Sequence, residues 1–176
     1  KYVYVVGDFN DWTPKADYQL KQDGEYFWVT LSGLTKGEEY AFQYLVDGSV
    51  YVADPYTDKV LDPWNDQYIE STTYPNLKPY PTGKAEGIVS VLQTGQAAYN
   101  WKVKNFERPA SEKLVIYEML IRDFTEEHTF NAAKEKLEYL KNLGVNAIEL
   151  MPINEFEGNT SWGYNPSFYF AVDKYY

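Results

Sequence analysis

The feature that most constrains this fold is a strand–helix–strand pattern in the second half of the chain. LVIYEMLI at 114–121 is a near-continuous apolar run, as expected for a buried parallel strand. FNAAKEKLEYLKNLG at 130–144 has helical spacing, and VNAIELMPI at 145–153 is a second apolar run. The order predicts a parallel βαβ unit. In barrels built from such units, the loops after the strands, here 122–128 and 154–166, carry function.

The helical segment has its own start and stop signals. Leu137, Leu140 and Leu143 form an apolar stripe opposite Lys and Glu side chains, which predicts one buried helix face. Asn131 is placed to cap the N-terminus of the helix, since its side chain can accept from free backbone N–H groups. Gly144 lies where a glycine after the last turn belongs.

Residues 1–70 have a different pattern, with short β-branched and aromatic runs between turns. YFWVTLSGL at 26–34 is one such run. Asp47 and Gly48 separate two others, and Asp-Gly between apolar runs is the strongest short-range signal for a β-hairpin. Several short strands with frequent turns predict a β-sandwich.

Residues 71–113 join these two parts. The stretch TTYPNLKPYPTGKAEG is rich in Pro and Gly and is typical of a linker. IVSVLQTGQAAYNW at 88–101 has the composition for an extra pair of strands. The expected organisation is therefore a β-sandwich at 1–70, a linker with extra strands at 71–113 and a βαβ portion at 114–176.

Charge and composition exclude several partners. Sixteen basic and 26 acidic residues give a net charge of −10, which argues against nucleic acid and anionic membrane surfaces. The absence of Cys excludes a disulfide framework and thiolate metal sites. No apolar run approaches the ~18 residues of a membrane span. Aromatic residues reach 18%, an excess that suits β-cores and also stacking on sugar rings.

Both halves resemble parts of known carbohydrate enzymes. VIYEMLIRDFT, GVNAIELMPI and WGYNP resemble the start of the catalytic barrel of glycoside hydrolase family 13, the α-amylase superfamily. GDFNDW and YLVDG resemble the carbohydrate-binding module family 48 sandwich that precedes that barrel in branching and debranching enzymes. The resemblance implies an immunoglobulin-like, early-set β-sandwich followed by an incomplete (β/α)8 barrel. A full barrel takes ~250 residues, whereas 66 remain from position 111.

The resemblance also implies a reaction. The family acts on α-1,4 and α-1,6 glucans such as starch, glycogen and maltooligosaccharides, by a retaining mechanism with two carboxylates. In the family these two carboxylates and a third acidic residue, which stabilises the transition state, lie beyond the fourth, fifth and seventh strands. We therefore expect no catalytic residue in this chain and no activity from it alone. The parent protein is expected to be an α-glucan hydrolase or transferase. The alternative is a starch- or glycogen-binding, or structural, sandwich module without catalysis.

The resemblance assigns candidate sugar contacts in the second loop. Tyr164 in SWGYNP matches the family tyrosine that stacks on the sugar in the cleaved subsite, and Trp162 and Asn165 flank it and shape the loop. An aromatic ring suits this task because a sugar has an apolar face and a hydroxylated rim. The competing interpretation of Tyr164 is an ordinary packed loop tyrosine.

Trp12 in GDFNDW is a weaker candidate for sugar contact. In glycogen-binding sandwiches the equivalent Trp stacks on glucan with help from a second Trp and a Lys. Here those positions align with Gln43 and Val50, so the set is incomplete. We therefore favour packing of Trp12 within the protein over glucan contact.

Charged residues near the strand ends invite a catalytic interpretation that we do not favour. Glu118, Arg122 and Asp123 follow or lie on the first barrel-like strand, where an ion-paired strand end is expected. Glu155 and Glu157 in the second loop are expected to be solvated. Neither group predicts a pair of catalytic acids.

No metal or cofactor is expected in this chain. His128 is its one histidine and is expected in a loop or cap, since a metal site needs three or four convergent ligands. The acidic stretch 62–67 lacks the pattern of a Ca²⁺ loop and is expected to form a turn, although Ca²⁺ in the parent protein is allowed. Cellular location is left open, with secretion or the periplasm favoured.

A βαβ portion that is only part of a barrel is also expected to leave apolar surface exposed. Its sheet would have unpaired edges and an open apolar face. We therefore expect residues 114–176 to pack on the sandwich or on a second copy of the chain, which makes self-association an expectation.

Overall fold

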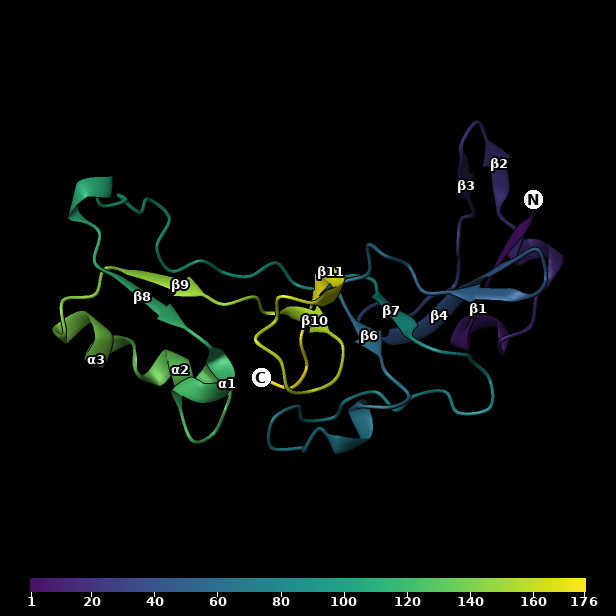
Figure 1. The fold of residues 1–176 in the computed structure, drawn as a ribbon. Helices are drawn as coiled ribbons and strands as arrows, with labels where there is room; N and C mark the ends of the chain where they lie inside the picture. Colours follow the sequence, from purple (N-terminus) through teal and green to yellow (C-terminus); the bar gives the residue numbers. More distant parts are fainter. The chain divides into compact units, whose positions relative to one another are not determined.

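A computed structural model describes residues 1–176. The chain is mostly sheet with few helices, which is compatible with a β-sandwich (Figure 1). It divides into two compact units: unit 1 consists of residues 1–68, 77–96 and 168–172, and unit 2 of residues 69–76, 97–167 and 173–176. None of its helices combines the length and the apolar character needed to cross a bilayer.

Unit 1 is built on a five-stranded antiparallel sheet. Its strands are β1 (Val3–Gly7), β4 (Glu39–Val46), β5 (Val50–Val52), β6 (Val60–Leu61) and β7 (Val89–Gln93). The order is β1-β4-β7-β6, with β5 also paired to β4. The register aligns Val3 with Val46 and Glu39 with Gln93. The long strand β4 therefore pairs with three others and organises the unit.

Strand β7 corrects the expected boundaries of the linker. It comes from the segment 71–113, yet it lies between β4 and β6, and residues 77–96 belong to unit 1. One strand forms there rather than the expected pair, because residues 94–101 adopt no strand. The apolar residues Val89 and Val91 explain the insertion, since both are almost fully buried in the unit 1 core.

The chain also contains a two-stranded hairpin in unit 1 and four short 3₁₀ helices, of which the last, η4, belongs to unit 2. The hairpin strands are β2 (Lys21–Asp23) and β3 (Tyr26–Trp28). The 3₁₀ helices are η1 (Asp8–Asn10), η2 (Ala16–Tyr18), η3 (Asp66–Tyr68) and η4 (Ser111–Lys113). The strand expected at 26–34 is thus only three residues long, and Val29 and Leu31 beyond its end pack on the same apolar cluster as Phe27.

The hairpin predicted at Asp47 and Gly48 is confirmed. The two residues have φ of 49° and 72°, the left-handed region that an Asp-Gly turn supplies. Val46 pairs with Val50 across the turn, which joins β4 to β5. The turn is also tied to the N-terminus, since the Asp47 carboxylate accepts a hydrogen bond from Tyr2 N at 2.9 Å.

Both faces of the unit 1 sheet are covered. Along β4, Ala41 and Leu45 belong to one apolar cluster, whereas Phe42 packs in a second cluster together with Tyr44. This alternation is that of a strand with two buried faces. Gln43 lies between them, 1% exposed, and its amide donates to the carbonyl oxygens of two residues in the 86–88 segment at 2.5 and 2.8 Å.

Unit 2 contains the strand–helix–strand segment (Figure 1). Strands β8 (Ile116–Met119) and β9 (Ala147–Leu150) are parallel, and Ile116 aligns with Ala147. The chain between them forms α1 (Ile121–Phe124), α2 (Phe130–Glu135) and α3 (Leu137–Asn142). Later come β10 (Asn154–Phe156) and β11 (Pro166–Val172), of which residues 168–172 belong to unit 1. The predicted parallel strand pair is confirmed.

The ends of the helical segment differ from the prediction at one terminus. The N-cap is Thr129, whose hydroxyl accepts from Ala132 N at 3.2 Å, and not Asn131. At the other end Gly144 has φ of 96° and its N–H bonds the Lys141 carbonyl at 3.0 Å. The next residue bonds the Leu140 carbonyl at 3.1 Å, which completes a Schellman motif and confirms the glycine stop.

Burial in unit 2 is lower than the apolar pattern predicts. Leu140 is 1% exposed and packs in the unit core, but Leu137 and Leu143 are 46% and 60% exposed. In β8 and β9, Ile116 is 55% and Leu150 is 43% exposed, so the expectation of a buried strand is wrong for these side chains. The reason is that the sheet has two strands and leaves apolar surface uncovered.

Candidate functional site

The candidate sugar contacts lie on an exposed loop of unit 2, residues 161–165, which we call the aromatic loop. Trp162 and Tyr164 are each 64% exposed, and Gly163 between them is buried. Gly163 has φ of 86°, and a Cβ atom there would overlap the carbonyl oxygen of Pro152. The loop therefore requires glycine at its centre, which allows the backbone between the two exposed aromatic residues to lie against Pro152.

Ser161 organises the aromatic loop from within. Its hydroxyl oxygen accepts a hydrogen bond from Gly163 N at 3.0 Å, a local turn typical of serine. The same hydroxyl donates to the Asn165 side-chain oxygen. The Asn165 side chain is exposed, so it is accessible to solvent as well as bonded to Ser161. The sequence analysis did not single out Ser161, although a Ser two residues before a Gly was a usable turn signal.

Arg122 connects the end of β8 to this loop. Its guanidinium group donates two hydrogen bonds to the Asp123 carboxylate, at 2.7 and 3.0 Å, and a third to the Ser161 carbonyl oxygen at 3.3 Å. The hydrogen bond between the two side chains lowers the pKa of Asp123 below its usual range and raises the pKa of Arg122. The predicted ion pair at this strand end is confirmed, whereas Glu118 is exposed and forms no part of it.

His128 supports Arg122 from the backbone side. Its Nδ1 bonds the Arg122 carbonyl oxygen, so Nδ1 carries the proton in this arrangement. His128 has φ of 58° and lies in a loop, as predicted. No cluster of three His, Cys, Asp or Glu side chains that would suit a metal ion occurs in the structure.

Glu155 contradicts its sequence-based expectation. It is 7% exposed rather than solvated, and its carboxylate forms an ion pair with Lys174, which is 3% exposed. Glu157, two residues later, is exposed as expected. Glu155 and Phe156 are neighbours in β10 and both are buried, so burial does not alternate along this strand. An alternating pattern could therefore not predict the burial of Glu155. Lys174 is 19 residues away, and no local pattern could have paired the two.

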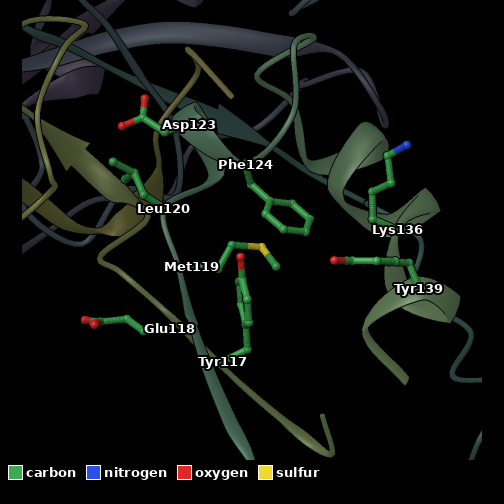
Figure 2. Close-up of a pocket in the computed structure, with 8 residues that line it drawn as sticks. All are labelled: Tyr117, Glu118, Met119, Leu120, Asp123, Phe124, Lys136 and Tyr139. Carbon is green, nitrogen blue, oxygen red and sulfur yellow. The ribbon is translucent and has the colours of Figure 1, made fainter. Parts of the chain in front are cut away.

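A cavity of about 580 Å³ lies elsewhere in unit 2, between β8 and the helices. Figure 2 shows Tyr117, Met119 and Phe124 directed into one space, with Tyr139 of α3 opposite, while the carboxylate of Glu118 points away. The lining is mostly aromatic and apolar. Two acidic residues, Glu118 and Asp123, belong to the lining, but the Glu118 carboxylate points away and Asp123 is paired with Arg122. The aromatic loop does not line the cavity.

Trp12 lies within unit 1 and is 8% exposed. Its ring packs in the apolar cluster with Val6 and Leu45, and its indole N–H donates to the Asp8 carboxylate at 3.1 Å. A ring buried to this extent offers almost no face to a sugar. The packing interpretation of Trp12 is therefore favoured over glucan contact.

The acidic stretch 62–67 forms the expected turn. The Asp62 carboxylate accepts from the backbone N–H groups of Trp64 and Asn65, at 2.7 and 3.1 Å. Asp66 in turn accepts from Asp62 N at 2.9 Å. These carboxylates are used to organise the turn, the common role of Asp in such sequences.

Known proteins that are similar to this chain match it across both units. No family profile matches the chain. It is 31% identical, over 96% of its length, to the malto-oligosyltrehalose trehalohydrolase of Saccharolobus solfataricus, of which it covers 28%. It is 30% identical, over 99% of its length, to a 1,4-alpha-glucan branching enzyme of Clostridium perfringens, of which it covers 25%.

The fold is also found in a solved structure. The whole chain superposes with a TM-score of 0.71 and 24% identity on an alpha amylase candidate from Salmonella typhimurium, of which it covers 25%. The chain thus spans about a quarter of the length of the relatives it matches. These matches cover 96% and 99% of the chain and so run through both units; the chain is thus similar over nearly its whole length to enzymes of glycoside hydrolase family 13, the α-amylase superfamily.

Proposed function

We propose that this chain is part of an α-glucan-acting retaining glycoside hydrolase or transferase. The observation that carries the proposal is the match to a trehalohydrolase and a branching enzyme over 96% and 99% of the chain. A match to the sandwich alone would favour a binding module. A match that continues through unit 2 favours an enzyme that has both parts in this order.

We further propose that β8 and β9 are the first two strands of a (β/α)8 barrel. Their parallel pairing supports this, because parallel sheets occur almost only where both faces are covered. The exposed side chains of Ile116 and Leu150 support it too, since further strands and helices would bury them. In this arrangement the catalytic carboxylates of the whole protein follow later strands than β8 and β9.

Within this chain, the aromatic loop is the proposed sugar-contacting part. Tyr164 and Trp162 present rings that are 64% exposed, next to the polar side chain of Asn165. An apolar ring face beside a hydrogen-bonding amide suits a glucose unit. Aromatic side chains lose little conformational entropy on binding, since they rotate about only two torsions.

Activity of the whole protein tests the enzyme proposal. Purified from its natural source, it is expected to change amylose, glycogen or pullulan in a reducing-sugar or branching assay. If all three glucans stay unchanged, the enzyme proposal fails and the binding-module alternative gains support. Mass spectrometry of the same preparation gives the length of the natural chain.

The sugar contact is tested on the 176-residue chain. We expect maltoheptaose to bind with a Kd on the order of 1 mM, since a single open wall buries little ligand surface. Tyr164→Ala is expected to abolish the binding detected by nuclear magnetic resonance (NMR) titration. Tyr26→Ala is the matched control, because Tyr26 is 77% exposed on unit 1. Equal loss in both variants would contradict a specific role for Tyr164.

A further inference from the structure

We infer that Arg122 is a positioning residue that holds the aromatic loop in the geometry needed to contact a sugar. The inference deepens the proposed function and rests on it for its ligand. Arg122 belongs to α1, directly after β8, whereas the loop is 39 residues further along the chain. The guanidinium group therefore links two elements that the sequence separates widely.

The geometry of the guanidinium group explains why an arginine is present. Nε and Nη2 donate to the two carboxylate oxygens of Asp123, at 2.7 and 3.0 Å. This bidentate pair fixes the plane of the group, and Nη1 is then directed at the Ser161 carbonyl oxygen at 3.3 Å. A lysine ammonium is a point donor on a flexible stem and cannot reproduce the three-way arrangement.

The hydrogen bonds of Ser161 also restrain the backbone next to the two aromatic residues. Because a peptide bond is planar, holding the Ser161 carbonyl also orients the N–H of Trp162. The Ser161 hydroxyl accepts from Gly163 N, which orients the next peptide plane, between Trp162 and Gly163. The two peptide planes that precede Tyr164 are therefore held by hydrogen bonds, although the rings of Trp162 and Tyr164 are 64% exposed.

Arg122 is suited to positioning rather than to chemistry. Its side chain is 21% exposed, and three of its five N–H donors are used in hydrogen bonds to Asp123 and Ser161. Its charge does not titrate at physiological pH, so it cannot act as a general acid or base. Its own carbonyl oxygen is held by His128, which anchors the backbone from which the side chain extends.

Backbone dynamics of the aromatic loop test the inference directly. We would measure ¹⁵N order parameters in the 176-residue chain for the wild type, Arg122→Ala, Arg122→Lys and Asp123→Asn. The wild-type loop is expected near the rigid value of about 0.85, and Arg122→Ala and Arg122→Lys below about 0.6. Asp123→Asn is expected to fall between them. Arg108→Ala is the matched control, since Arg108 is the other arginine and is exposed.

Maltoheptaose titration supplies the functional arm. Loss of Arg122 is expected to weaken binding about tenfold, the effect of losing one charge-assisted hydrogen bond. Wild-type order parameters retained in Arg122→Ala and Arg122→Lys would overturn the inference. If Arg122→Ala fails to fold by circular dichroism, Arg122→Lys and Asp123→Asn decide. If the wild type does not bind maltoheptaose, the proposed sugar contact fails, whereas the dynamics still decide whether Arg122 positions the loop.

Discussion

At the residue scale, the buried ion pair of Glu155 and Lys174 makes the sharpest prediction. Glu155→Gln leaves the Lys174 charge buried without its carboxylate partner, and we expect a loss of about 3–5 kcal/mol in the free energy of unfolding. Urea denaturation measures the loss. The double variant Glu155→Leu with Lys174→Met removes both charges and is expected to be closer to the wild type. If Glu155→Gln is as stable as the wild type, the burial of this ion pair is contradicted.

Asp123 gives a prediction about pH. Because Arg122 lowers the pKa of Asp123 in the folded chain, the pair stabilises the fold above the unfolded pKa of Asp123. That contribution is lost as pH falls through the lower folded pKa, and it is small because the Asp123 side chain is 58% exposed. A carboxyl NMR titration should place Asp123 below a typical aspartate. Arg122→Ala should move it up, and an unchanged midpoint in that variant would contradict the assignment.

At the element scale, variants at the start of α2 test whether Thr129 or Asn131 caps the helix. Thr129→Ala removes the hydroxyl that accepts from Ala132 N, and we expect a loss of about 1 kcal/mol in the free energy of unfolding. Asn131→Ala is the control, since Asn131 lies inside the helix and does not cap it. Denaturant titration of both variants distinguishes them. A larger cost for Asn131→Ala would favour the cap expected from the sequence.

Some ends of the helices could be predicted from the sequence, and others could not. Gly144 was identified correctly because its left-handed φ of 96° is a local requirement that glycine meets. Thr129 and Asn131 are both acceptable cap residues by type, and the choice between them depends on where packing starts the helix. The break between α2 and α3 at Lys136 could not be predicted either, since no Gly or Pro marks it.

At the scale of the whole molecule, exposed apolar surface on the β8–β9 sheet keeps self-association as a prediction that can be tested. Ile116 and Leu150 are 55% and 43% exposed on a two-stranded sheet. We expect sedimentation equilibrium to show a mass that rises with concentration. Ile116→Lys should shift the chain toward monomer, because a charge on a strand blocks edge pairing. Val103→Lys, at a position 62% exposed in a loop, is the control.

The outcome of that experiment is informative in both directions. A monomer at every concentration tested would contradict association through this surface. Equal dissociation in Ile116→Lys and Val103→Lys would point to a general charge effect and not to the β8–β9 sheet.

The sequence by itself determined the elements whose cause is local. The Asp47 and Gly48 turn, the Gly144 stop and the two apolar runs that pair as β8 and β9 depend on residue type and spacing within a few positions. Its motifs also indicated the kind of enzyme that the chain is similar to, because WGYNP and its neighbours occur together in one order. These features follow from backbone preference and hydrophobic periodicity, which a single sequence contains in full.

Only the tertiary structure decided contacts between distant positions. β7 forms where an extra strand was expected, but its place between β4 and β6 is set by the fold. Glu155 is buried against a lysine 19 residues away, and Arg122 reaches Ser161 across 39 residues. Trp12 is likewise buried by Val6 of β1 together with residues of β4, β6 and β7, which lie far along the chain. Each outcome depends on which side chains the whole fold brings together, since burial and hydrogen bonding are set by neighbours in space and not along the sequence.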